Sequence, residues 1–165
     1  MTQDPKEERT PEEELEYAYQ KLKSDLSVEL LDIVKSSSPA FFEKLVIDLF
    51  IGMGYGGSRK DAGEAMGKSG DGGIDGIIKE DKLGLSIIYI QAKRWENAVP
   101  VKEIRDFTGA LASQKAKKGI FITTSHFPKS VYEFVEKIEY KIGMLYNMLE
   151  YLFGNNGQDY YLIVH

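Results

Sequence analysis

A repeating pattern of apolar residues predicts a long helix near the start of the chain. The apolar positions recur every three or four residues, which is the period of an amphipathic helix; they are Leu15, Ala18, Leu22, Leu26, Leu30 and Ile33. Thr10 is suited to cap this helix, with Pro11 in the first turn and Glu13 completing a capping box. We expect the helix to run to Ser36, with a break near Ser27.

A second apolar stripe predicts a shorter helix directly afterwards. Ser38 and Pro39 provide a cap and a first residue, and Gly54 provides an end. The stripe consists of Phe42, Leu45, Val46, Leu49, Phe50 and Met53. Glu43 lies at the border of this stripe, where a carboxylate is a candidate metal ligand or, equally, a surface acid whose stem covers apolar neighbours.

Two strands are predicted in the middle of the chain, over residues 74–79 and 87–93. The second strand has apolar side chains on both faces, which is typical of a strand inside a covered sheet. The segment between them ends in Gly84 and favours an antiparallel hairpin. Such pairing brings Asp75, at the start of the first strand, close to Gln91 and Lys93, at the end of the second.

The remaining pattern predicts a strand, a helix, a strand and a helix. Pro100 begins a helix, residues 119–125 form a short strand, and Pro128 begins another helix. A strand, helix and strand in succession imply a right-handed crossover between parallel strands. Further on, the pattern predicts a helix over residues 147–153 and a short strand over 160–164.

The polar residues of the hairpin suggest metal chemistry. A carboxylate and an amide oxygen are hard ligands of the kind that Mg²⁺ prefers, so Asp75 and Gln91 are candidate ligands. Lys93 can orient a water and offset negative charge on a phosphate. A different interpretation is open: the buried aspartate and lysine can form a structural pair that only stabilises the hairpin.

Charge is distributed unevenly along the chain. The net charge is −5, but residues 1–16 carry seven acids against two bases. Residues 91–118 carry seven bases against three acids, and we expect this basic excess to lie beside the proposed site, where it suits either a phosphate backbone or a solvated helix face. The candidates for contact with the DNA backbone are Arg94, Lys102, Arg105, Lys117 and Lys118.

Composition excludes some other kinds of site. The chain has no cysteine, which excludes disulfides and thiolate metal sites. Without a membrane span or a signal peptide in the pattern, we expect a cytoplasmic protein.

Four segments of the sequence resemble the catalytic domain of the Mrr restriction endonuclease family. They are FFEKLVIDLFIGMGYGG, SGDGGIDGII, IYIQAKRW and FTGALASQKAKKGIFITTS. This family comprises type IV enzymes similar to the wider PD-(D/E)xK nucleases. The resemblance implies an α/β restriction-endonuclease-like fold, with three α/β/α layers, a mixed central sheet and a preceding N-terminal helix. It places the catalytic acid at Asp75, the (E/Q)xK pair at Gln91 and Lys93, and the first-helix glutamate at Glu43.

The resemblance also implies a function and a division of the chain. It predicts a Mg²⁺-dependent endonuclease that acts on double-stranded DNA in restriction of modified foreign DNA. Asp75, Gln91 and Glu43 would hold the metal. Residues 1–37 would form an acidic tail and helix, and residues 38–165 the nuclease domain.

The sequence departs from the family pattern after about residue 139. The segment from Lys141 to Tyr146 lacks the acid and glycine of the family's IDG-like turn, which leaves open whether the family's last strand and helix are kept. The alternative function is therefore an inactive or weakly active remnant that binds DNA or a partner. A homodimer and a separate DNA-recognition subunit are both open as assemblies.

Overall fold

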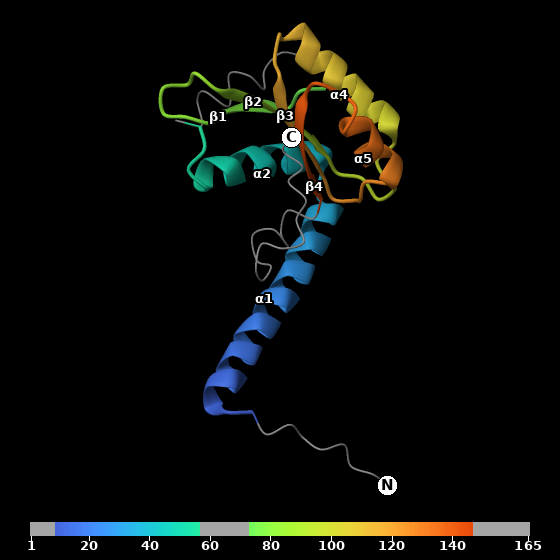
Figure 1. Cartoon of the computed structure of the whole chain (residues 1–165). Helices are drawn as coiled ribbons and strands as arrows, with labels where there is room; N and C mark the ends of the chain where they lie inside the picture. Colours follow the sequence, from blue (N-terminus) through green and yellow to red (C-terminus); the bar gives the residue numbers. More distant parts are fainter. Residues whose placement is uncertain (1–8, 57–72, 147–165) are drawn as a thin grey trace.

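The computed structural model describes residues 9–56 and 73–146, which form helices packed on a four-stranded sheet (Figure 1). In chain order the elements are α1 (Pro11–Ser36), α2 (Pro39–Gly52), β1 (Gly76–Lys79), β2 (Ile87–Lys93), α4 (Val101–Ser113), β3 (Lys118–Thr123), α5 (Lys129–Val135) and β4 (Lys141–Tyr146).

Helix α1 begins with the predicted capping box. The Thr10 side chain accepts a hydrogen bond from the Glu13 backbone N–H, and the Glu13 carboxylate accepts one from the Thr10 N–H. The helix continues without a break past Ser27, so the expected interruption there is wrong. A lone serine inside a helix costs too little to end it when the flanking residues are good helix formers. Most of α1 extends away from the sheet, and only its last turns approach the core (Figure 1).

The sheet is mixed, with strand order β1-β2-β3-β4. β1 and β2 form the predicted antiparallel hairpin, in which Gly76 lies opposite Ile90. β2 and β3 are parallel, as the crossover through α4 requires, and β4 is parallel to β3. The carboxyl ends of β2, β3 and β4 therefore lie at the same end of the sheet, and β1 begins beside them.

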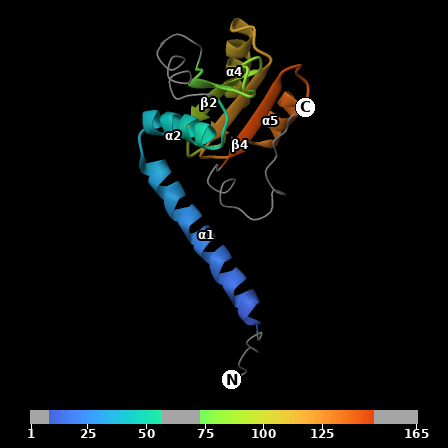
Figure 2. The ribbon, with the colours of Figure 1, turned by 90° about the vertical axis from the view of Figure 1, so that its left-hand side faces the viewer.

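Helices cover both faces of the sheet, which confirms the three-layer architecture (Figure 2). On one face α2 packs against the hairpin and β3 through Val46, Phe50, Ile90 and Ile122. On the other face α4 and α5 enclose an aromatic core centred on Phe121 of β3. Because β2 and β3 carry apolar side chains toward both helical layers, the sheet holds its polar residues only at the strand ends.

Residues Lys141–Tyr146 form a true strand despite their departure from the family pattern. Ile142, Met144 and Leu145 of β4 are buried, and the strand pairs along its whole length with β3. The structure thus settles in favour of a strand here what the sequence left open: apolar contacts with both cores hold β4 in place, and the acid and glycine are not needed for that. The helix predicted over 147–153 and the strand over 160–164 lie outside the described residues. Within the described part of the chain, no helix is long and apolar enough to cross a membrane.

Candidate active site

Asp75 sits immediately before β1 and ties the start of that strand to β2. Its backbone N–H donates to the carbonyl of Ile90 at 2.8 Å, and its carboxylate accepts the backbone N–H of Ala92 at 2.7 Å. The Asp75 carboxylate thus binds the Ala92 N–H, which would otherwise need a backbone carbonyl from a longer β1. This explains why β1 begins at Gly76 rather than at the predicted residue 74.

The Asp75 carboxyl is desolvated. Burial raises its pKa from 3.8 to about 6, against the lowering effect of the Ala92 N–H. The negative charge of Glu43 raises this pKa further and the positive charge of Lys93 lowers it. Both charges therefore lie close enough to Asp75 to act on its carboxyl. A bound cation would stabilise this carboxylate, because it offsets the free-energy cost of burying the negative charge.

Gln91 contributes a buried amide at the same end of β2. Its side chain is 3% exposed, and no residue of the described segments donates a hydrogen bond to Oε1. A buried carbonyl oxygen without a donor is costly and calls for an explanation. A cation bound to Oε1 would provide that explanation, because it would give the oxygen a partner.

Gly73 lies directly against the Gln91 amide. Its φ of +94° is one that L side chains rarely adopt, and a Cβ placed there would collide with Nε2 of Gln91. The glycine therefore lets the chain before Asp75 pass close to the amide, and it encloses the side chain on that side.

Lys93 is the last residue of β2. Its carbonyl accepts hydrogen bonds from Thr123 Oγ1 at 2.9 Å and from the Thr124 N–H at 3.3 Å, which hold the ends of β2 and β3 together. A hollow of about 540 Å³ lies at this end of the sheet and is lined by residues that include Trp95, Thr124 and Tyr146. In open α/β sheets, ligands bind at the carboxyl ends of parallel strands.

The donor set fits magnesium better than softer metals. No cluster of three His, Cys, Asp or Glu side chains that could hold a metal occurs in the described ranges. Two carboxylates, Asp75 and Glu43, and the amide oxygen of Gln91 remain as candidate ligands. Mg²⁺ is bound in this way, through one or two carboxylates, while it keeps several waters.

Three of the basic residues expected to contact DNA already have partners within the protein. Arg94 donates from Nη1 to the carbonyl of Lys35 at 2.6 Å, which links the end of α1 to the residue after Lys93. On α4, Lys102 forms a 2.5 Å ion pair with Asp106, and Arg105 lies 5.3 Å from the ring centroid of Phe134. These are contacts that a DNA backbone could share or replace, because both α4 side chains are exposed. Their role in DNA binding stays a prediction.

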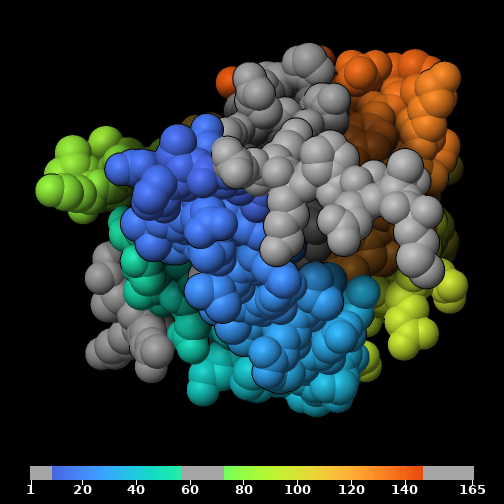
Figure 3. All heavy atoms as spheres, turned by 90° about the horizontal axis from the view of Figure 1, so that it is seen from below, coloured from blue at the N-terminus to red at the C-terminus, as the bar shows by residue number. Residues whose placement is uncertain are grey.

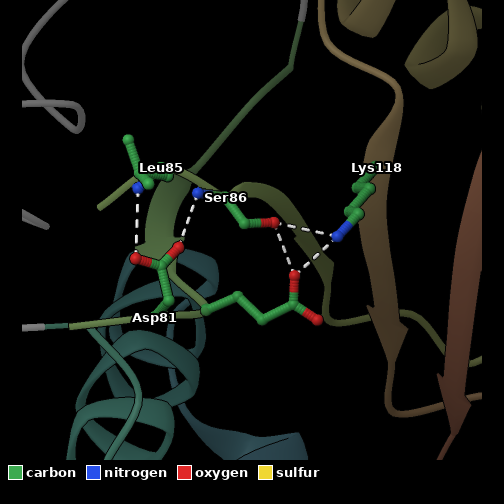
Figure 4. Close-up of polar contacts among 5 residues, drawn as sticks. Asp81, Leu85, Ser86 and Lys118 are labelled. Atoms are coloured by element: carbon green, nitrogen blue, oxygen red, sulfur yellow. Dashed lines mark hydrogen bonds and ion pairs between the residues drawn. The ribbon is translucent and has the colours of Figure 1, made fainter. Parts of the chain in front are cut away.

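Lys117 and Lys118 do not lie beside the site. They precede and begin β3, whereas Lys93 pairs with Thr123 at the other end of that strand. The separation is about 16 Å at the usual strand rise. Lys118 instead binds Glu80 at 2.6 Å and Ser86 at 2.8 Å, next to the hairpin turn (Figure 4). The expectation of one basic surface beside the site is wrong for these two lysines. The parallel crossover places the start of β3 at the opposite end of the sheet from the end of β2.

Sequence reasoning missed two features of the site, Gly73 and the contact of Arg94 with α1. The two consecutive glycines at positions 72 and 73, just before the aspartate, were an available signal, because glycine permits positive φ and close approach. The Arg94 contact had no local signal, since it joins residues 59 positions apart.

Comparison with known proteins identifies the family. The restriction endonuclease family Mrr_cat matches residues 34–146, a range that contains Glu43, Asp75, Gln91 and Lys93. The chain belongs to this restriction endonuclease family. It is also 45% identical, over 130 residues, to the type IV methyl-directed restriction enzyme EcoKMrr of Escherichia coli strain K12. That match covers 79% of this chain but 42% of the relative, so the chain spans less than half the length of the relative.

A solved restriction endonuclease is also similar in structure. The chain aligns with MspJI restriction endonuclease in complex with a 27-mer oligonucleotide at a TM-score of 0.46 and 16% sequence identity. The alignment covers 88% of this chain and 33% of the MspJI chain.

Proposed function

We propose that this member of the restriction endonuclease family is a magnesium-dependent endonuclease that hydrolyses phosphodiester bonds of double-stranded DNA. The observation that carries the proposal is the pairing of a desolvated acid with an unsatisfied amide oxygen. Asp75 is held with a raised pKa, and Gln91 presents a buried Oε1 without a donor among the described residues. Both features are unfavourable in the protein alone, and both become favourable when a hard cation binds.

Each residue of the site has a distinct task in this proposal. When bound, Mg²⁺ supplies positive charge that polarises the phosphate and lowers the pKa of a water. Asp75 and Gln91 would hold the cation, together with Glu43 of α2. Lys93 orients the attacking water and stabilises negative charge as it builds on the phosphate oxygens. The water oxygen gives up a proton to the solvent and forms a bond to phosphorus, the bond from phosphorus to the leaving oxygen breaks, and that oxygen takes up a proton from the solvent.

The substrate in the cell is proposed from the relative. The E. coli protein is called a methyl-directed type IV enzyme, and we propose that this chain likewise takes part in restriction of modified DNA in the cytoplasm. Arg94, Lys102 and Arg105 follow the end of β2 in the chain, and we propose them as contacts for the phosphate backbone. Phosphate contacts position a duplex without reading its sequence, so they account for binding and not for recognition of the modified base.

The proposal is tested by plasmid nicking. Purified protein is incubated with supercoiled DNA, with Mg²⁺ or with a chelator, and the wild type is run beside Lys93→Ala. The matched control is Lys82→Ala, which removes the same charge from the exposed hairpin turn at the other end of β2. We expect nicking only with Mg²⁺, retained in the Lys82 variant and lost in the Lys93 variant. Nicking that persists in the chelator, or that is equal in both variants, would contradict the proposal.

A further inference from the structure

Helix α1 carries a row of apolar side chains that the described structure leaves uncovered. The row, called here the α1 seam, consists of Leu15, Tyr19, Leu22 and Leu26. Leu15 is 73% exposed and Leu22 is 70% exposed, and the other two are exposed as well. Seen from below, α1 lies in front of the other described helices and the sheet (Figure 3). Large apolar side chains gathered on one exposed helix face mark an interaction surface.

The spacing of the seam is that of a helix that pairs with another helix. Successive members are four, three and four residues apart, which is the alternation that brings knobs of one helix into holes of another. The domain is contacted instead by the last turns of α1, through Leu30, Leu31 and Val34, and no residue of the seam belongs to that core. The seam is therefore free of any role in attaching α1 to the sheet.

We propose that the α1 seam binds the α1 seam of a second copy of this chain, with the two helices antiparallel. The seam is symmetric about the point between residues 20 and 21. An antiparallel partner therefore places Leu15 against Leu26 of the second copy and Tyr19 against Leu22 of the second copy, so all four layers are apolar. A two-fold axis through that point generates the same contacts from both chains, which is the property of a closed dimer interface.

Charged residues beside the seam favour the antiparallel arrangement. Glu16 lies between Leu15 and Tyr19, and Lys23 occupies the equivalent place between Leu22 and Leu26. In the antiparallel pair each Glu16 faces Lys23 of the other chain, so two unlike pairs flank the seam. The Lys23 ammonium already lies 5.3 Å from the ring centroid of Tyr19, on the side of the seam. A parallel pair would instead set Lys23 opposite Ala18 and would leave both charges without a partner across the interface.

Glu29 also discriminates between the two arrangements. It continues the three-four alternation after Leu26, before Ile33. In a parallel pair, the two copies of Glu29 would face each other between the apolar layers of Leu26 and Ile33, where like charges are costly. In the antiparallel pair Glu29 faces Glu12 of the second copy at the end of the row, where water solvates both acids.

The geometry predicts how the dimer arranges its two nuclease domains. Ser36 lies about 23 Å along the helix from the centre of the seam, at the usual rise per residue. The two points of attachment are therefore about 46 Å apart, at opposite ends of the helix pair. The two candidate sites remain separate, so pairing joins two domains without changing the rate of nicking at each.

The first test is the mass of the full chain in solution by sedimentation as protein concentration rises. The wild type should pass from monomer to dimer. Leu22→Glu should remain a monomer over the same range, whereas Val28→Glu, which adds the same charge to an exposed aliphatic position away from the seam, should dimerise as the wild type does. A wild type that stays monomeric, or a Val28 variant as impaired as the Leu22 variant, would overturn the proposal. Helix content from circular dichroism shows that both variants fold.

The direction of the helices is tested by charge exchange and by cross-linking. Glu16→Lys and Lys23→Glu should each weaken the dimer, and an equal mixture of the two should restore it through a mixed pair. Because the chain has no cysteine, single cysteines report contacts directly. Leu15→Cys mixed with Leu26→Cys should form a disulfide-linked dimer on oxidation. Efficient linkage of Leu15→Cys to itself would show parallel helices and refute the antiparallel arrangement.

Discussion

Replacing Gly73 by alanine is expected to inactivate the site through its neighbour, Gln91. The new Cβ would overlap Nε2 of the Gln91 amide. Because Gln91 is 3% exposed, its side chain has little room to move away, and the amide oxygen must shift with the nitrogen. A misplacement of about 1 Å in a catalytic group lowers rates about 10²-fold. We therefore expect Gly73→Ala to lower the nicking rate at least by that factor.

The chain contains a matched control for the backbone effect. Gly54 has the same φ of +94°, but a Cβ there would meet no atom within 4 Å. Gly54→Ala should cost about 1–2 kcal/mol of stability from the left-handed backbone alone. Gly73→Ala should cost a further 1–3 kcal/mol or so from overpacking. Chemical denaturation measures both values, and the nicking assay is run on the same preparations at a temperature at which both variants are folded.

A double variant separates the effect of the steric collision with Gln91 from that of the left-handed backbone conformation at residue 73. In the Gln91→Ala background the amide is absent, so Gly73→Ala should then cost only about as much as Gly54→Ala. If Gly73→Ala costs the same with and without the Gln91 side chain, the two residues do not collide. If Gly73→Ala nicks DNA as fast as Gly54→Ala, the amide has no positional role, and this account of Gln91 fails.

Three further predictions concern the charged residues of the site. Lys93→Ala should lower the single-turnover nicking rate by roughly 10²–10³-fold while the thermal midpoint stays near that of the wild type; an unchanged rate would show that the lysine is structural. Asp75→Asn should be inactive. Without metal at pH 8 it should be more stable than the wild type by about 1–2 kcal/mol, allowing for solvent screening of a partly buried group. Denaturation curves that show a loss of stability instead would mean that the buried charge of Asp75 does not destabilise the fold. Mg²⁺ affinity, followed by calorimetry, should fall about tenfold per pH unit below the Asp75 pKa of about 6 and should be flat well above it. An affinity that stays constant as the pH is lowered through and below that pKa would exclude Asp75 as a ligand.

The sign of the Asp75 effect on stability follows from the direction of its pKa shift. The folded protein raises this pKa from 3.8 to about 6, so it binds the proton more tightly than the unfolded chain does. Between these two values the wild type should lose stability as pH rises, because the buried carboxyl becomes charged. Asp75→Asn cannot ionise and should not show this loss. The comparison of the two proteins over that range isolates the contribution of Asp75.

Local signals in the sequence were sufficient for the hairpin and the helix caps. The alternation from Ile87 to Lys93 and the turn before it depend on neighbouring residues, so the antiparallel pairing and the grouping of Asp75 with Gln91 and Lys93 were predictable. The capping box at Thr10 was predictable for the same reason. The first residue of β1 was not, because the Asp75 side chain replaces the backbone as the partner of Ala92.

Features that depend on contacts between distant residues were beyond local signals. Lys117 and Lys118 follow α4 closely in the sequence, yet the crossover places them at the opposite end of the sheet. Strand β4 lacks the family's turn residues but is held by apolar contacts to both cores, which a motif does not record. The close packing of Gly73 on Gln91 is likewise a property of the folded chain.

Anomalous scattering from a crystal grown with Mn²⁺ and a short DNA duplex tests the central claim most directly. Mn²⁺ shares the preference of Mg²⁺ for oxygen ligands and can be located by its own signal. We predict one peak at the end of β2, bound by oxygens of Asp75 and Gln91 and adjacent to a phosphate that Lys93 contacts. A crystal that cleaves its DNA but shows the peak elsewhere, with Asp75 and Gln91 making no contact to it, would contradict the assignment of this site.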